Sequence, residues 1–164
     1  MTFRSALASR RPAVLAALLG LAVTAAACGS TEPQSVPIEQ TKFADTLHVD
    51  LARSTPLASG MYVRDSVMGT GAVVAAGQTV SVRYIGYLAN GSSFDDNAPP
   101  KPLFIFKLGS GAVIPGFDIG LQGMKVGGRR QLIIPPELGY GASGARSIPP
   151  YAVLVFIVDM ISAS

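Results

Sequence analysis

Residues that usually carry acid–base or metal chemistry are scarce in this chain. It has one histidine, His48, one cysteine, Cys28, and no tryptophan among 164 residues. A Ser-His-Asp arrangement needs a histidine beside the nucleophile, and structural zinc sites need several His or Cys ligands. Ser92 and Ser93 lie near Asp95, but the only histidine is far from them in the sequence. We therefore expect no hydrolase triad, no bound metal and no cofactor.

An excess of charge of one sign is also lacking once the N-terminus is set apart. Arg4, Arg10 and Arg11 account for three of the 13 Lys and Arg residues, which leaves 10 basic residues against 10 acidic ones. The sequence pI of about 9.2 therefore reflects the first residues more than the rest. No basic stripe interleaved with aromatic residues occurs, so nucleic acid is not an expected partner.

The N-terminus has the pattern of an export signal. Its arginines precede an apolar run over residues 13–27, which is short for a transmembrane helix. The run ends in Ala25-Ala26-Ala27-Cys28, and small residues before a lone cysteine resemble a bacterial lipoprotein processing site. On this interpretation residues 1–27 are a lipoprotein signal peptide and Cys28 becomes the lipidated first residue. The alternative is an ordinary signal peptide followed by a buried thiol.

The lipoprotein interpretation also predicts a location. The protein would be exported and held at the periplasmic face of the cell envelope by its N-terminal lipid only. Gly29 follows the cysteine in place of the aspartate associated with inner-membrane retention, which favours an outer membrane where one is present.

The rest of the chain divides into a linker and one domain. Residues 28–55 are rich in Ser, Thr, Pro and Gln without a sustained apolar period, which predicts a flexible or loosely docked tether. Phe43, Leu47, Val49 and Leu51 are the residues in it that could lay a short segment against the domain. Residues 56–164 are enough for a single domain with its own core and no disulfide.

The pattern of apolar residues predicts five strands and one helix. The strands are rich in β-branched and aromatic residues and cover residues 61–67, 79–88, 103–108, 131–134 and 152–161. The helix is predicted to begin near Pro115, with Phe117, Leu121 and Met124 at positions i, i+4 and i+7. The predicted fold class is α+β, an antiparallel twisted sheet of about five strands wrapped around one short helix.

Four short segments occur in a characteristic order between residues 77 and 161. They are Val82-Arg83-Tyr84-Ile85-Gly86, Ser93-Phe94-Asp95, Val113-Ile114-Pro115-Gly116-Phe117 and Tyr140-Gly141-Ala142, the last leading on to Ile148-Pro149-Pro150. In this order and spacing they resemble the pocket of an FKBP-type peptidyl-prolyl cis-trans isomerase. The resemblance implies the same α+β fold and a rotamase that helps exported proteins to fold outside the cytoplasm.

The resemblance also implies a set of site residues and partners. The implied catalytic residues are Tyr84, Phe94, Asp95, Ile114, Phe117, Tyr140 and Phe156, with the backbone N–H of Ile114 as a donor to the peptide. The implied substrate-binding residues are Phe104, Phe106, Val113 and Ile148. The implied partners are proline-containing client polypeptides and macrolide inhibitors, bound by a monomer.

Two departures from the family pattern keep an alternative function open. The family usually has tryptophan at the base of the pocket, where this chain has Phe117. The arginine often found after the Phe-Asp pair is absent, and Pro99-Pro100-Lys101-Pro102 occupies that stretch. The alternative is a proline-binding or chaperone-like module that keeps the pocket and turns over weakly.

Overall fold

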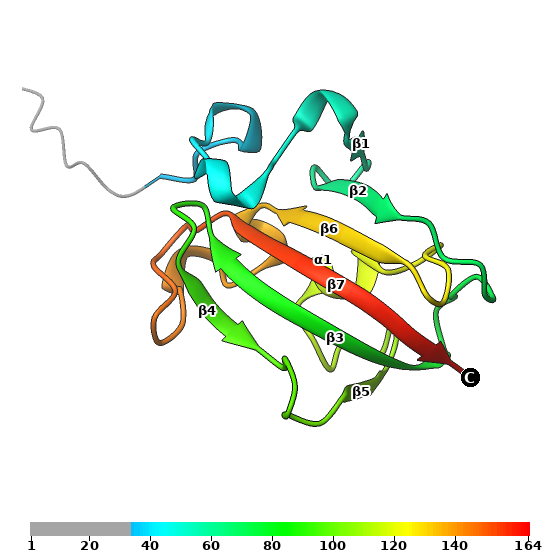
Figure 1. Ribbon diagram of the computed structural model, residues 1–164. Coiled ribbons are helices and arrows are strands. Elements are labelled where there is room, and N and C mark those ends of the chain that lie inside the picture. Colours follow the sequence, from blue (N-terminus) through cyan, green and yellow to red (C-terminus); the bar gives the residue numbers. More distant parts are fainter. Residues whose placement is uncertain (1–33) are drawn as a thin grey trace, which may run out of the picture. The chain divides into compact units, whose positions relative to one another are not determined.

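The structure is a computed structural model that describes residues 34–164, so the predicted signal peptide and Cys28 lie outside the described residues. A single antiparallel sheet dominates this part of the chain (Figure 1). Its seven strands are β1 (Thr55–Pro56), β2 (Tyr62–Val67), β3 (Thr79–Leu88), β4 (Ser93–Asp96), β5 (Phe104–Lys107), β6 (Arg129–Ile134) and β7 (Leu154–Ala163). The strand order is β1-β2-β6-β7-β3-β4, with β5 also paired to β3.

The predicted fold class is confirmed, although the sheet has seven strands rather than about five. The five predicted strands correspond to β2, β3, β5, β6 and β7. The two additional strands are short: β1 has two residues and β4 has four. Neither is long enough to give a recognisable period-two pattern of apolar residues.

One helix, α1 (Pro115–Gly120), covers one face of the sheet (Figure 1). Gly116 and Gly120 let the helix backbone approach β6, because a Cβ on Gly120 would lie 2.8 Å from Leu132 Cδ2. The prediction that the helix continues to Met124 is wrong. The chain turns after Leu121, and Gly123 takes a φ of +74° that ends helical geometry. Leu121 and Met124 are nevertheless buried, so the apolar stripe describes the core contact rather than the length of the helix.

The N-terminal segment, residues 34–55, lies against the opposite face of the sheet. It forms three short 3-10 helices, η1 (Ile38–Gln40), η2 (Asp45–Leu47) and η3 (Leu51–Arg53). Ile38 is only 2% exposed and forms a second apolar cluster with Ile133 of β6 and Val153, which precedes β7. Phe43, Val49, Leu51 and Tyr62 pack against this cluster.

Residues 34–55 are thus docked on the sheet, the second of the two arrangements predicted for the tether, and the predicted docking residues Phe43, Leu47, Val49 and Leu51 take part. Hydrogen bonds fasten the segment at several points, including Ala44 N–H to the Ala89 carbonyl at 2.8 Å and Gln131 Nε2 to the Leu47 carbonyl at 2.8 Å. The apolar residues of the segment dock one at a time through separate short turns, so they show no helix or strand period in the sequence.

Membrane-spanning helices are not found among residues 34–164, where no helix is long and apolar enough to cross a bilayer.

Candidate active site

A pocket of about 510 Å³ opens between the sheet, α1 and the loops around α1 and η5 (Gly141–Ser143). Its lining is mostly aromatic and aliphatic. The lining residues are Tyr84 from β3, Asp95 from β4, Phe104 from β5, Ala112, Val113 and Ile114 before α1, Phe117 in α1, Tyr140 beside η5 and Phe156 from β7. Elements far apart in the sequence therefore each contribute one or a few side chains to a single apolar cavity.

Phe117 is the centre of this aromatic arrangement and is only 3% exposed. Its ring centroid lies 5.7 Å from that of Tyr84, 5.3 Å from that of Phe156 and 5.9 Å from that of Phe106. The contacts to Tyr84 and Phe156 are edge-on, the arrangement that the charge distribution of aromatic rings favours. Phe117 consequently forms a rigid floor for the pocket.

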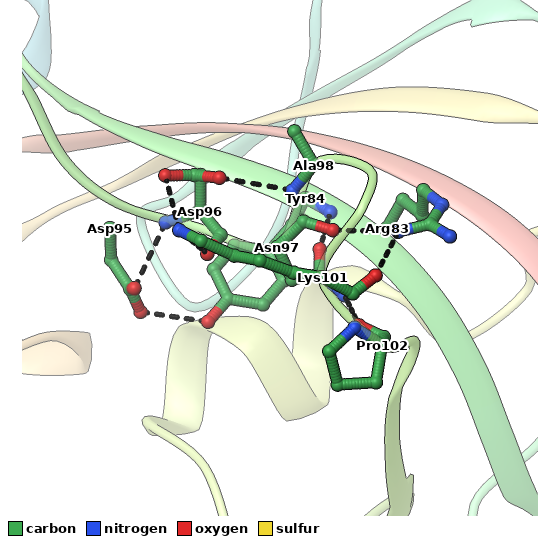
Figure 2. A network of polar contacts seen from close by, with 8 residues as sticks. All are labelled: Arg83, Tyr84, Asp95, Asp96, Asn97, Ala98, Lys101 and Pro102. Carbon is green, nitrogen blue, oxygen red and sulfur yellow. Dashed lines mark hydrogen bonds and ion pairs between the residues drawn. The ribbon is translucent and has the colours of Figure 1, made fainter.

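Asp95 and two tyrosines supply the polar groups of the pocket. The Tyr84 hydroxyl donates to Asp95 Oδ2 at 2.7 Å, and the Asp96 N–H donates to Asp95 Oδ1 at 2.9 Å (Figure 2). Burial, followed by the hydrogen bond to Asp95, raises the pKa of the Tyr84 phenol well above its ordinary value. Burial and then the charge of Asp95 raise the pKa of Tyr140 as well. Both phenols therefore stay protonated at neutral pH and can act as hydrogen-bond donors.

Asn97 holds the loop between β4 and β5, and sequence reasoning missed it. Its Oδ1 accepts from the Tyr84 N–H at 2.6 Å, while its Nδ2 donates to the carbonyls of Val82 at 3.0 Å and Pro102 at 3.3 Å. Arg83 Nη1 donates to the Asn97 carbonyl at 2.7 Å (Figure 2). The amide thus ties the strand that carries Tyr84 to the loop that follows Asp95. A lone asparagine before a proline-rich stretch carries no signal of this role beyond a turn.

Lys101 does not take the place of the absent arginine beside Asp95. Its ammonium pairs with Asp96 Oδ2 at 2.9 Å and also donates to the Asp96 carbonyl at 3.1 Å. The hydrogen bond from Lys101 lowers the pKa of Asp96. Among residues 34–164, Asp95 is in no ion pair, so no basic side chain is placed against its carboxylate at the pocket wall.

Most of the predicted site residues come together in the pocket, and three do not line it. Phe94 packs behind Phe156, with ring centroids 5.5 Å apart. Phe106 is buried and stacks on Phe104 at 5.1 Å, on the core side of that wall. Ile148 is 8% exposed and belongs to the core. A residue that lines the pocket and one that packs behind it cannot be told apart from the sequence, because both are apolar and belong to the same motifs or strands.

The loop before α1 contributes two further features. Ala112 lines the pocket and was not predicted, since a single alanine carries no chemical signal. The backbone N–H of Ile114, the N-cap residue of α1, donates no hydrogen bond within the described part of the chain. It is therefore available to a carbonyl oxygen of a bound molecule.

Metal ligands do not gather anywhere in residues 34–164: no three His, Cys, Asp or Glu side chains come together in the way that a metal site needs. The pocket accordingly offers apolar walls, two phenols, one carboxylate and one backbone donor.

Comparison with known sequences identifies the family. The family model for FKBP-type peptidyl-prolyl cis-trans isomerases matches residues 71–161. The peptidyl-prolyl cis-trans isomerase FKBP15-3 of Arabidopsis thaliana is 40% identical over 131 residues, which cover 79% of this chain and 92% of that protein. FK506-binding protein 3 of Candida albicans is 46% identical over 106 residues, 65% of this chain. The matched region spans only 25% of that fungal protein, and similarly small fractions of several other relatives.

Solved structures show the same fold. The crystal structure of AtFKBP13 superposes with a TM-score of 0.63 at 36% identity and covers 68% of this chain and 98% of its own. The crystal structure of FkpA from Escherichia coli gives a TM-score of 0.63 at 35% identity, over 68% of this chain and 52% of that one. The order of the motifs, the fold and the pocket agree with these matches, and the chain belongs to the FKBP-type peptidyl-prolyl cis-trans isomerase family.

Proposed function

We propose that this protein catalyses cis–trans isomerisation of the peptide bonds that precede proline in client polypeptides, as a monomer. The observation that supports this most directly is the composition of the pocket. Of the nine residues that line it, Asp95 has the only carboxyl group, none is Lys, Arg or His, and five are aromatic. Such a site can bind an apolar ring and exclude water, but it offers no nucleophile and no proton-transfer histidine.

The chemistry of the X–Pro bond suits a pocket of this kind. The barrier to rotation is about 18–20 kcal/mol because resonance gives the C–N bond partial double-bond character. Both isomers are populated, yet uncatalysed exchange takes about 10–100 s. In the twisted transition state the nitrogen lone pair is no longer conjugated with the carbonyl, so the charge-separated form is lost. That state needs less solvation than the planar amide, and a dry pocket therefore binds it preferentially.

We infer a task for each polar group from its position. With the proline ring against Phe117, Tyr84 and Phe156 flank it and fix its orientation. The free N–H of Ile114 and the Tyr140 hydroxyl are placed to donate to carbonyl oxygens of the peptide on either side of the ring. The carbonyl carbon of the twisted amide is more electron-poor than in the planar amide, so the Asp95 carboxylate stabilises it further. Each tenfold gain in rate needs about 1.4 kcal/mol of such preference.

A proline tetrapeptide assay tests the proposal. The protein should raise the rate of cis-to-trans exchange in proportion to its concentration, and a macrolide of the kind for which FK506-binding proteins are named should inhibit competitively. Binding of the peptide without acceleration would instead favour the alternative, a proline-binding or chaperone-like module. Phe117 in place of the usual tryptophan is the feature that favours this second candidate, because a smaller floor holds the ring less tightly.

We also propose that the protein is exported and anchored through lipid on Cys28, with exported chains as its clients. The support is the sequence pattern alone: arginines, an apolar run, and small residues before the only cysteine. Mass spectrometry of the mature N-terminus tests this. A diacylated cysteine start, together with release from membranes in Cys28→Ser, is the expected result. An intact residue 1 or an unmodified Cys28 would contradict it.

A further inference from the structure

A second groove, of about 460 Å³, lies on the face of the sheet opposite α1. Arg64 and Gln131 are directly paired across β2 and β6, and Gln131 is paired with Ile157 of β7. All three alternate with core residues, such as Val63 and Leu132, and so face away from the active-site pocket. The N-terminal segment closes one side of the groove with Leu47 and His48.

Two buried polar atoms of the residues that line this groove have no hydrogen-bond partner in the described part of the chain. Gln131 is 2% exposed, and its Oε1 accepts no hydrogen bond within the described residues. Its Nε2 donates to the Leu47 carbonyl at 2.8 Å, and a carbonyl can only accept, so this contact fixes which end of the amide is the free acceptor. Arg64 Nε, also buried, donates to no group in residues 34–164, although Nη2 of the same side chain donates to the His48 carbonyl at 2.8 Å. Buried polar atoms without a protein partner are uncommon, and a bound water or ion often supplies the missing contact.

The charge of the groove is uncompensated at Arg64. Its neighbours along β6 are paired: Arg129 binds Asp159 with contacts of 2.6 and 2.9 Å, and Arg130 binds Asp65 at 2.7 Å. Arg64 is half-buried and makes no ion pair with any residue in 34–164. The lining of the groove includes Arg64, Arg129 and His48 but no Asp or Glu. A negatively charged occupant is therefore favoured over a neutral one.

We propose that this groove is a binding site for an oxyanion that carries a hydroxyl group, with hydrogenphosphate and glycerol phosphates as its simplest representatives. An anionic oxygen accepts from Arg64 Nε, and the hydroxyl donates to Gln131 Oε1. One small molecule thereby satisfies both unpartnered atoms and the unpaired charge. The site goes beyond the isomerase function and uses none of the residues assigned to it.

Isothermal titration of the full-length protein at constant ionic strength tests the proposal with three probes. Inorganic phosphate and glycerol 3-phosphate should both bind, and the tighter of the two shows whether a free ion or a phosphoglycerol headgroup is the better ligand. Sulfate at neutral pH has the charge but no hydroxyl, so it should bind about tenfold more weakly, the effect of one hydrogen bond. Equal affinity for sulfate and phosphate would overturn the assigned role of Gln131 and with it the proposal.

The Nε–Hε signal of Arg64 in a 1H–15N correlation spectrum should shift on addition of phosphate. Arg64→Gln should weaken phosphate binding by at least about tenfold, since it removes a charge-assisted hydrogen bond. Arg53→Gln removes the same charge from the exposed η3 and should leave both affinity and spectrum unchanged. No heat and no shift in the wild-type protein would mean that water alone fills the groove, and equal losses in both variants would mean non-specific attraction; either result overturns the proposal.

Discussion

The two faces of the sheet differ in the side chains that line their cavities. On the α1 side, Phe104, Phe117 and Phe156 join Tyr84 around a pocket with one charged residue. On the other side, alternate residues of β2 and β6 place Arg64, Arg129 and Gln131 in a groove beside the N-terminal segment. Because neighbouring residues of a strand point to opposite faces, a step of one residue along the chain separates the two environments.

The different packing of the two faces explains why the proposed isomerase pocket lies on the α1 side. There, the strands are backed by one continuous core, and the apolar walls are held in place by buried neighbours such as Leu132 and Val158. Within residues 34–164, the opposite face carries a smaller cluster around Ile38 and a groove whose lining mixes polar and apolar residues. A twisted amide is favoured by a dry, rigid site, and only the first face supplies one.

The largest effect is expected from truncating the aromatic residue at the centre of the pocket. Phe117→Ala removes a ring that is 3% exposed and should cost about 3–5 kcal/mol of unfolding free energy through the cavity it leaves. It should also remove most of the isomerase activity, because the proline ring loses its floor. Urea denaturation and the tetrapeptide assay measure the two effects on the same protein.

A matched control separates stability from activity in that experiment. Leu121 follows α1, is 0% exposed and does not line the pocket. Leu121→Ala should therefore cost about 2–5 kcal/mol while kcat/KM of the folded fraction stays near the wild-type value. If both variants lost activity in parallel, the loss would follow from reduced packing and Phe117 would have no specific role.

The opposite face should respond differently. Ile38→Ala truncates a side chain that is 2% exposed in the small cluster with Ile133 and should cost about 2 kcal/mol, the low end for such a change because the segment can settle inward. The activity of the folded protein should not change. Val36, 48% exposed in the same segment, is the control, and Val36→Ala should alter neither quantity. A fall in kcat/KM for Ile38→Ala would show that the two faces are coupled.

A finer test asks whether the aromatic wall of the pocket tolerates one added methyl group behind it. Gly86 of β3 faces the rings, and a Cβ there would lie 2.6 Å from Phe94 Cζ and 2.8 Å from Phe156 Cε1. Gly86→Ala must push one ring aside, which should cost about 1–3 kcal/mol of stability. Because Phe156 lines the pocket, kcat/KM should fall even where the protein is fully folded. Wild-type kinetics in a folded Gly86→Ala protein would mean that Phe94 alone moves and that the wall tolerates it.

These two faces were not equally predictable from the sequence. The longer strands are rich in β-branched and aromatic residues, so the apolar pattern predicts them, and in β3 the alternate residues Val80, Val82 and Tyr84 face the core on the α1 side. The N-terminal segment docks Ile38 and Leu47 through separate 3-10 turns, and no period links them. Its position is fixed by contacts with residues far along the chain, such as Ile133 and Val153 beside Ile38, and a local sequence pattern does not contain such contacts.

The candidate site follows the same division. Its aromatic residues and Asp95 lie in short motifs whose order is informative even before the fold is known. Asn97 makes three hydrogen bonds to residues on both sides of a loop, and an isolated asparagine in the sequence does not predict them. The resemblance implies Phe94 as a catalytic and Phe106 as a substrate-binding residue, but both pack behind the residues that line the pocket, because the sequence distinguishes apolar from polar residues and not lining residues from supporting ones.

The smallest expected effect is a difference in pKa between two tyrosines, one on each face, that each donate to a carboxylate. Tyr84 donates to Asp95 at 2.7 Å beside the pocket, and Tyr62 donates to Glu39 at 2.6 Å on the opposite face. The pKa of each phenol is raised, but burial is the first cause for Tyr84, whereas the hydrogen bond to Glu39 is the first cause for Tyr62. In a pH titration followed by NMR, Tyr84 should therefore ionise after Tyr62.

The sign and the cause of these shifts can be tested by removing each carboxylate. A native pKa above the unfolded value of about 10 stabilises the fold fully below pH 10, and the stabilisation is lost as the pH rises through the native pKa. Glu39→Gln should bring the pKa of Tyr62 close to its ordinary value, while Asp95→Asn should leave that of Tyr84 raised, because burial remains. Salt should affect the exposed Tyr62 pair more than the Tyr84 pair. If Asp95→Asn returned Tyr84 to ordinary titration, water would have to reach the phenol, and the pocket would not be the dry site that preference for a twisted amide requires.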